Sequence, residues 1–111
     1  MGSMRIVGIL DKYTAEVYKF LGVEVYTCDV SQNLSDFVIS KLNELKDRKE
    51  VFSVIISKNI SSLIKKELRD FILSHQRPFV VEVDPVFDIG KYEDYETMIK
   101  KIVSETIGIK L

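Results

Sequence analysis

The sequence predicts an α/β protein built on a parallel β-sheet, and two observations support this. Short apolar runs alternate along the whole chain with segments whose apolar residues recur at helical spacing. The first run, residues 4–11, is almost continuously apolar, as expected for a strand that is buried on both faces of a parallel sheet. Right-handed crossovers between parallel strands make the order 2-1-3-4 the simplest arrangement.

The composition predicts one globular domain. The chain has 111 residues, of which 46% are hydrophobic and 30% are charged, with a formal net charge of -1. Because Lys and Arg are neither in excess nor clustered, neither nucleic acid nor an acidic membrane surface is expected as the main partner. The single cysteine, Cys28, excludes an internal disulfide. No apolar run approaches the roughly 20 residues that cross a bilayer, and no secretory signal is present, so we expect a cytoplasmic location without membrane insertion.

The first half of the chain contains two predicted strands and two predicted helices. After the first strand, a turn at Asp11 leads into a short helix that Gly22 ends. Residues 23–28 alternate apolar with polar side chains, which predicts a strand at the edge of the sheet. Asn33 or Ser35 can cap the next helix. Its apolar positions recur at helical spacing, and they are Leu34, Phe37, Val38, Leu42 and Leu45.

The second half predicts two further strands, a third helix and a C-terminal extension. Residues 51–57 are short, apolar and β-branched, which is typical of a central parallel strand. One helix is expected to follow and to end before His75, with an apolar face made of Ile60, Leu63, Ile64, Leu68, Phe71 and Ile72. Pro78 then starts the fourth strand, residues 79–83.

The domain boundaries follow from these elements. Residues 4–84 are expected to form a flavodoxin-like, four-stranded parallel domain with flanking helices. Residues 85–111 are expected to form a linker and a helix from about residue 93 to 106, which Gly108 ends. Residues 1–3 have the character of a remnant of cloning.

The carboxyl ends of the strands are the usual ligand site in such a sheet, and here they carry Asp11, Ser57 and Asp84. The turn after the first strand has neither of the glycine patterns that cradle phosphates, so a nucleotide is not expected. A phospho-acceptor receiver domain needs an acceptor carboxylate after the third strand and a lysine after a later one, and both are missing. A metal site made of Asp11 and Asp84 is an alternative to two loop or capping aspartates, which we favour.

Cys28 and His75 are the remaining candidates for catalysis. Cys28 ends the second strand, whereas His75 ends the third helix and therefore lies toward the opposite edge of the sheet. A helix-terminal histidine that faces the helix dipole is the more usual role. The sequence thus predicts no catalytic residue, no cofactor and no metal.

Several short features occur in a particular order along the chain. Gly8 and Asp11 accompany the first strand, Gly22 precedes the second, and Pro78 leads into the fourth, before a terminal Ile107-Gly108-Ile109-Lys110-Leu111. In this order, and in length, the chain resembles the F subunit of the V-type and A-type rotary ATPases. The likeness covers essentially residues 4–111 and depends on the combined order, since no single motif is diagnostic.

The resemblance implies a non-catalytic subunit of the central stalk, or rotor. In that family a small α/β domain is followed by a mobile C-terminal segment, and the protein binds the long coiled-coil D subunit. It helps to couple ATP hydrolysis or synthesis to ion transport. The catalytic head and the stalk subunit that connects to the membrane ring are further potential contacts. The resemblance also implies a cytoplasmic location, peripheral to the membrane within a membrane-bound complex.

The last predicted helix supplies the candidate partner-binding residues. Its apolar stripe can lie along a partner helix or can instead cover the fourth strand. Because an exposed stripe favours aggregation, we expect the second arrangement for the chain alone and the first in an assembly. The rival function is a stand-alone receiver-like or small-ligand-binding regulator that uses the crevice around Asp11, Ser57 and Asp84. The candidate partner-binding residues are Tyr92, Tyr95, Met98, Ile99, Ile102, Val103 and Ile107.

Overall fold

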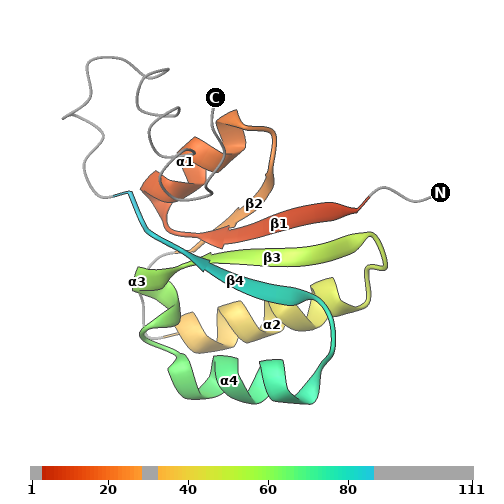
Figure 1. Cartoon of the computed structure of the whole chain (residues 1–111). Coiled ribbons are helices and arrows are strands. Elements are labelled where there is room, and N and C mark those ends of the chain that lie inside the picture. The colour runs from red at the N-terminus through yellow and green to blue at the C-terminus, as the bar shows by residue number, and fades with distance from the viewer. Residues whose placement is uncertain (1–3, 29–32, 87–111) are drawn as a thin grey trace.

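A four-stranded, all-parallel sheet forms the centre of the protein, with helices on both faces (Figure 1). The computed structural model describes residues 4–28 and 33–86. The strands follow the order β2-β1-β3-β4, so the predicted flavodoxin-like α/β fold is confirmed. The strands are β1 (Arg5–Leu10), β2 (Glu24–Thr27), β3 (Val51–Ser57) and β4 (Phe79–Val83). The helices are α1 (Lys12–Phe20), α2 (Leu34–Lys46), α3 (Lys58–Ser61) and α4 (Lys65–Ser74).

Each face of the sheet has its own hydrophobic core. Val7 and Ile9 of β1 belong to the larger core, which α2 and α4 cover on one face. Leu10, Ile55 and Val83 belong to the smaller core, which α1 covers on the other face. Because alternate residues of a strand point to opposite faces, a nearly continuous apolar run such as β1 supplies both cores. As the sequence predicted, β1 is buried on both faces, from Val7 onward.

Local sequence signals account for both ends of α1. Asp11 is its N-cap, and the Asp11 carboxylate accepts a hydrogen bond from the backbone N–H of Thr14. After the helix, Gly22 has a φ of 86°, a left-handed conformation that costs glycine little. Asn33 is the N-cap of α2, as predicted, but its side chain makes no capping hydrogen bond.

The single helix predicted after β3 is wrong, because two helices, α3 and α4, occupy this region. Ile64, between them, has a non-helical backbone with φ -131° and ψ 34°, and its side chain is 2% exposed. This break lets Ile60 and Ile64 both enter the larger core. Leu63 and Ile72, which the helical spacing assigned to the same apolar face, are exposed instead.

Gly8 lies inside β1, where there is little room for a side chain. A Cβ at this position would meet Leu10 Cδ1 at 2.9 Å and Ile55 Cγ1 at 3.4 Å. The close contacts of Gly8 are thus with side chains of the sheet itself. Among the described helices, none combines the length and the apolar character needed to span a membrane.

Candidate functional site

The carboxyl edge of the sheet brings together two of the residues that the sequence singled out. The backbone N–H of Asp11 lies 3.3 Å from the Ser57 hydroxyl oxygen, to which it donates. Both Asp11 carboxylate oxygens accept from Thr14, one from the backbone N–H at 3.2 Å and the other from the hydroxyl at 2.7 Å. Asp11 is therefore engaged as a helix cap, which confirms the interpretation that we favoured.

Thr14 also fixes the segment that follows β4. Its side chain is fully buried, and its hydroxyl oxygen accepts a hydrogen bond of 2.9 Å from the backbone N–H of Val86. The same hydroxyl donates to Asp11, so it satisfies a buried donor and an acceptor at once. Val86 itself is 7% exposed and packs in the smaller core. Val86, the last described residue, is therefore held beside the start of α1.

Asp84, the third candidate of this edge, has a separate partner. Its carboxylate lies 2.9 Å from the Lys58 ammonium, and both side chains are largely exposed. The hydrogen bond to Asp84 raises the pKa of Lys58. Burial, with a smaller contribution from the charge of Asp84, raises the pKa of Tyr18, a buried residue of α1. Within residues 4–28 and 33–86, no group of three or more His, Cys, Asp or Glu side chains could hold a metal ion.

Cys28 and His75 lie at opposite ends of the strands, as predicted. Cys28 is buried, and its backbone N–H donates to the carbonyl of Leu10 at the carboxyl end of β1. His75 follows α4 and precedes β4, with its ring stacked on Phe71 at 4.2 Å between centroids. The Nδ1 atom lies 2.9 Å from the Phe71 carbonyl oxygen. His75 therefore closes the last turn of α4, where a donor is favourable.

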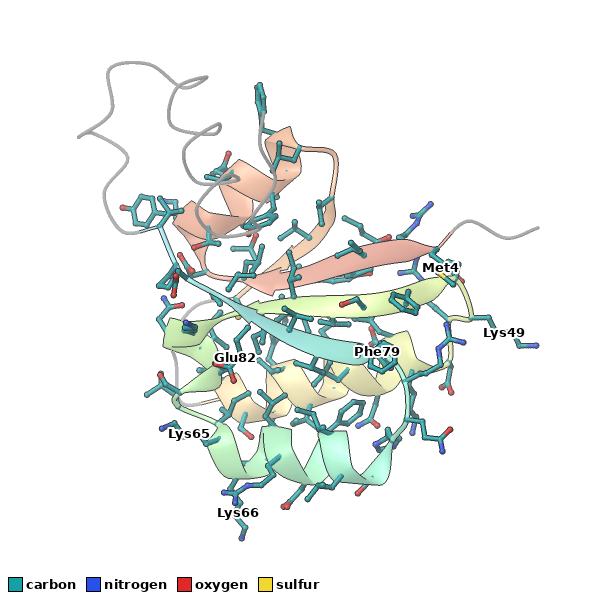
Figure 2. The ribbon with its side chains drawn as sticks, in the orientation of Figure 1. Met4, Lys49, Lys65, Lys66, Phe79 and Glu82 are labelled. Atoms are coloured by element: carbon teal, nitrogen blue, oxygen red, sulfur yellow. The ribbon has the colours of Figure 1, made fainter. Side chains whose placement is uncertain are left out.

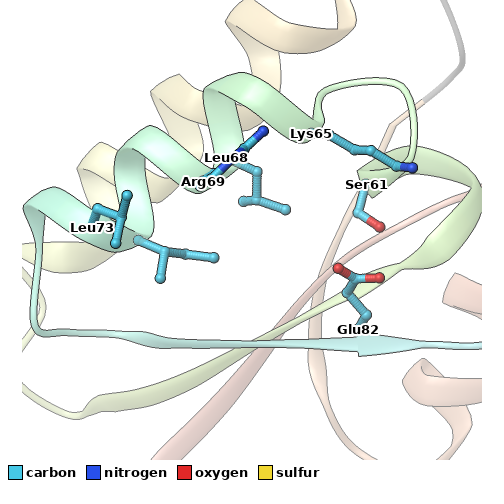
Figure 3. A pocket seen from close by; sticks show the side chains of 7 residues that line it. Ser61, Lys65, Leu68, Arg69, Leu73 and Glu82 are labelled. Carbon is cyan, nitrogen blue, oxygen red and sulfur yellow. The ribbon is translucent and has the colours of Figure 1, made fainter.

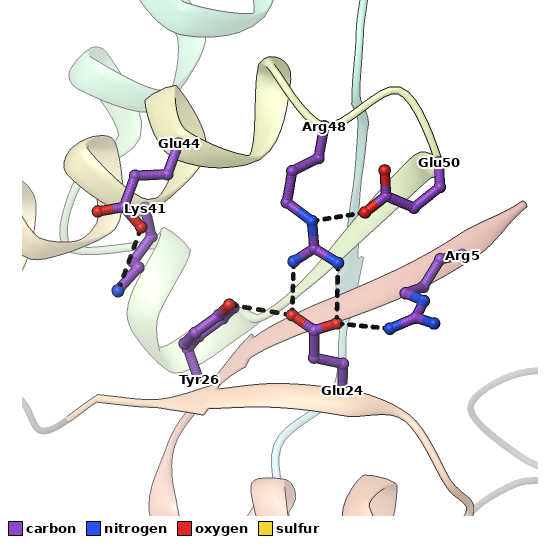
Figure 4. A network of polar contacts seen from close by, with 7 residues as sticks. All are labelled: Arg5, Glu24, Tyr26, Lys41, Glu44, Arg48 and Glu50. Carbon is purple, nitrogen blue, oxygen red and sulfur yellow. Dashed lines mark hydrogen bonds and ion pairs between the residues drawn. The ribbon is translucent and has the colours of Figure 1, made fainter.

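A polar network lies at the amino end of β2, and the sequence did not predict it (Figure 4). Arg48, after α2, donates to both carboxylate oxygens of Glu24 at 2.7 and 3.1 Å. Arg5 and Tyr26 donate to the same carboxylate at 3.0 and 2.9 Å. Arg48 also donates to Glu50 at 2.7 Å. The alternation of β2 indicated that Glu24 is polar, but its pairing with Arg48 depends on the fold.

The ionisation of Glu24 reflects this network. Chiefly because Arg48 donates hydrogen bonds to it, the pKa of Glu24 falls from 4.5 to about 2. The same contacts raise the pKa of Arg48, and the hydrogen bond to Glu24 raises that of Tyr26. Bidentate pairing of Arg with a carboxylate is a strong and geometrically specific contact. The network therefore holds β1, β2 and the segment before β3 together at the amino edge of the sheet.

The seven predicted partner-binding residues, Tyr92, Tyr95, Met98, Ile99, Ile102, Val103 and Ile107, lie outside the described residues. An apolar surface within the domain was not expected, and we call it the β4 patch. It lies on the face of the sheet that carries α1. Phe79 and Val81 are 53% and 47% exposed, and the Phe79 ring meets Phe52 edge-to-face at 5.2 Å. The patch comprises Met4, Ile6, Phe52, Phe79 and Val81, of which Met4 and Phe79 are labelled in Figure 2.

Among the described residues, α1 is the one helix on this face, and it does not cover all four strands. Ile6, Ser53 and Phe79 are neighbours across three strands in the register of the sheet. The α1 helix packs on the carboxyl half of this face, over Leu10 and Val83. Exposed apolar residues that are contiguous, rather than scattered, commonly mark an interaction surface.

Comparison with known proteins does not assign a family. No family model matches the chain, and no curated protein matches it.

Proposed function

We propose that the chain is a non-catalytic central-stalk (rotor) subunit of a V/A-type rotary ATPase, equivalent to the F subunit. It binds the coiled-coil D subunit through its C-terminal stripe and helps to couple ATP hydrolysis or synthesis to ion transport. It would act in the cytoplasm, peripheral to the membrane as part of the complex. The ordered sequence features and the four-stranded parallel fold support this proposal.

The observation that carries the proposal is that Val86, which directly precedes residues 87–111, is held firmly in the domain. A rotor subunit transmits force between its domain and the segment that grips its partner, so the junction must resist pulling. Here a buried hydrogen bond to Thr14 and burial in the smaller core hold this junction. Residues 87–111, with the predicted apolar stripe, continue directly from it.

The contacts of the two carboxylates at the carboxyl edge of the sheet also support the proposal. In the rival regulator, Asp11 and Asp84 would be available to a ligand or cation. In the folded domain the Asp11 carboxylate caps α1, and the Asp84 carboxylate is paired with Lys58. A ligand that used both carboxylates would have to displace these contacts, which costs free energy.

Co-expression with the D subunit of a V/A-type ATPase from the same organism tests the proposal. We expect a one-to-one complex of this chain with the D subunit, measured by size-exclusion chromatography with light scattering. The double variant Ile99→Asp and Ile102→Asp should abolish the complex, because charges in an apolar helix interface are strongly unfavourable.

A matched control places the same charges on the other side of the predicted helix. Thr97→Asp and Ser104→Asp lie opposite the stripe at helical spacing and should retain the complex. A folded Ile99/Ile102 variant that binds normally would move the interface away from the stripe. Stoichiometric binding of a nucleotide, Mg²⁺ or an acyl phosphate by the isolated chain, measured by calorimetry, would instead favour the rival regulator.

A further inference from the structure

The edge of the sheet formed by β4 is open within the described part of the chain. In the strand order β2-β1-β3-β4, β4 is the terminal strand and pairs in parallel with β3, from Phe79 opposite Ser53 to Val83 opposite Ser57. The peptide groups of a parallel strand alternate in direction, so some of those in β4 point away from β3. Unpaired groups along an edge are a template for another strand.

A groove runs beside this edge, between β4 and the helices α3 and α4 (Figure 3). It has a volume of about 180 Å³ and apolar walls from α4. Leu73 and Ile72, on these walls, are 78% and 46% exposed, so their apolar surface is open to contact. The residues that line the groove are Ser61, Lys65, Leu68, Arg69, Ile72, Leu73 and Glu82.

Both faces beside β4 are therefore apolar. Phe79 and Val81 of the β4 patch lie on the face of α1, whereas the groove lies on the face of α4. A strand added along β4 would direct alternate side chains to these two faces. One row would enter the groove, and the other row would lie beside Phe79 and Val81. An isolated helix could cover one of these surfaces but could not pair with the backbone between them.

The charges of the groove define the chemistry of the occupant further. Lys65 extends from α4 toward the end of the groove at Ser61, and Glu82 points from β4 toward Ser61 (Figure 3). Arg69 of α4 also lines the groove. Within residues 4–28 and 33–86, neither Lys65 nor Arg69 takes part in an ion pair. The groove thus presents two cations and one carboxylate, which favours an acidic side chain in the row that enters it.

We propose that the open edge of β4 binds an extended segment of a partner protein as a fifth strand. This segment has apolar residues at alternate positions and an acidic residue that faces Lys65 and Arg69. Main-chain hydrogen bonds to β4 supply the attraction, and the groove selects the side chains. The binding residues differ from those of the C-terminal stripe, so the inference does not require that the chain binds the D subunit.

A synthetic strand peptide tests the inference on the full chain. The probe has about nine residues, in which valine alternates with threonine and one central residue that faces the groove is aspartate. We expect saturable binding with a Kd of about 0.1–1 mM and amide NMR shifts confined to β4, α4 and their flanks. The same peptide with N-methyl groups on alternate peptide bonds keeps its side chains but loses the hydrogen bonds. It should bind at least about tenfold more weakly.

A charge exchange tests the orientation in the groove. Arg69→Glu, at an exposed position of α4, should weaken the aspartate peptide about fivefold and favour a peptide with lysine in its place. Lys19→Glu on α1 is the matched control and should change neither affinity. Three results would overturn the inference: no saturable binding, shifts that map elsewhere, or equal binding of the N-methylated peptide. Occupation of the edge by residues 87–111 would prevent peptide binding and would overturn it as well.

Discussion

The two edge strands of the sheet differ in how their side chains are covered. In β2, Glu24, Val25 and Tyr26 are all partly buried. Val25 packs toward α1, and the polar network and Lys41 cover Glu24 and Tyr26 from the other side. In β4, by contrast, Phe79 and Val81 are about half exposed.

The two edge strands also differ in the charged residues around them. Charged residues at an edge discourage pairing with other chains, and β2 carries Glu24, which lies at the centre of a charged network. Arg5, Arg48 and Glu50 all belong to the network around Glu24. The β4 edge keeps Glu82 beside the apolar groove but has no comparable network among the described residues. We infer that the β2 edge is protected from pairing and that the β4 edge is available to a binding partner.

The largest loss of stability should come from removing the contacts between Arg48 and Glu24 at β2. Arg48→Met removes the bidentate partner of Glu24 while it keeps most of the aliphatic volume. Hydrogen bonds to charged groups contribute about 1.5–3 kcal/mol. Since the Arg48 and Glu24 side chains are 31% and 27% exposed, we expect a loss of about 1–2 kcal/mol in the free energy of unfolding. Urea denaturation measures it. An unchanged midpoint would mean that the network contributes nothing to stability.

Lowering the pH should weaken the network around Glu24 without any mutation. The pKa of Glu24 is lowered from 4.5 to about 2, so its contribution is complete above pH 4.5 and is lost as the pH falls toward 2. Such a shift corresponds to about 3 kcal/mol when it is not screened, and solvent exposure reduces it to about 1 kcal/mol.

The comparison variant for this pH dependence is Glu24→Gln. Between about pH 5 and pH 2, its unfolding free energy should fall by about 1 kcal/mol less than that of the unmodified protein. Glu44→Gln removes a carboxylate from an exposed pair with Lys41 and should not change the pH dependence. Parallel curves for the Glu24 variant and the unmodified protein would contradict the assignment.

The smallest effect on stability should come from the open edge. Val81→Lys places a charge at a position that is 47% exposed, and we expect a change of less than about 0.5 kcal/mol in unfolding free energy. The same change should decrease binding of the strand peptide several-fold. A large loss of stability would show that Val81 belongs to the core, and the contrast between the edges would then fail.

The order of the elements could be predicted because each element carries a local signal. The run in β1, the alternation in β2 and the cap at Asp11 are all encoded within a few residues. The break between α3 and α4 could not be predicted, since the helical spacing continues through Ile64. Its buried, non-helical conformation arises because Ile60 must enter the same core directly after β3. Tertiary packing overrides the local periodicity here.

The surfaces were harder to predict than the fold. Periodicity indicates that Ile72 and Val81 are apolar members of regular elements, but it does not indicate whether another element covers them. The contact between Glu24 and Arg48 joins residues 24 positions apart, so it requires the β2 and β3 registers to be known. Asp11 was assigned its capping role correctly because that role depends only on Thr14, three residues away. The partner-binding role of the C-terminal stripe stays a prediction.

The hydrogen bond between Val86 and Thr14 has a consequence for synthesis of the chain. It joins residues 72 positions apart, so it can form only after nearly all of the domain has emerged from the ribosome. Until then the Thr14 hydroxyl lacks this partner. The domain must therefore be nearly complete before Val86 is held in place.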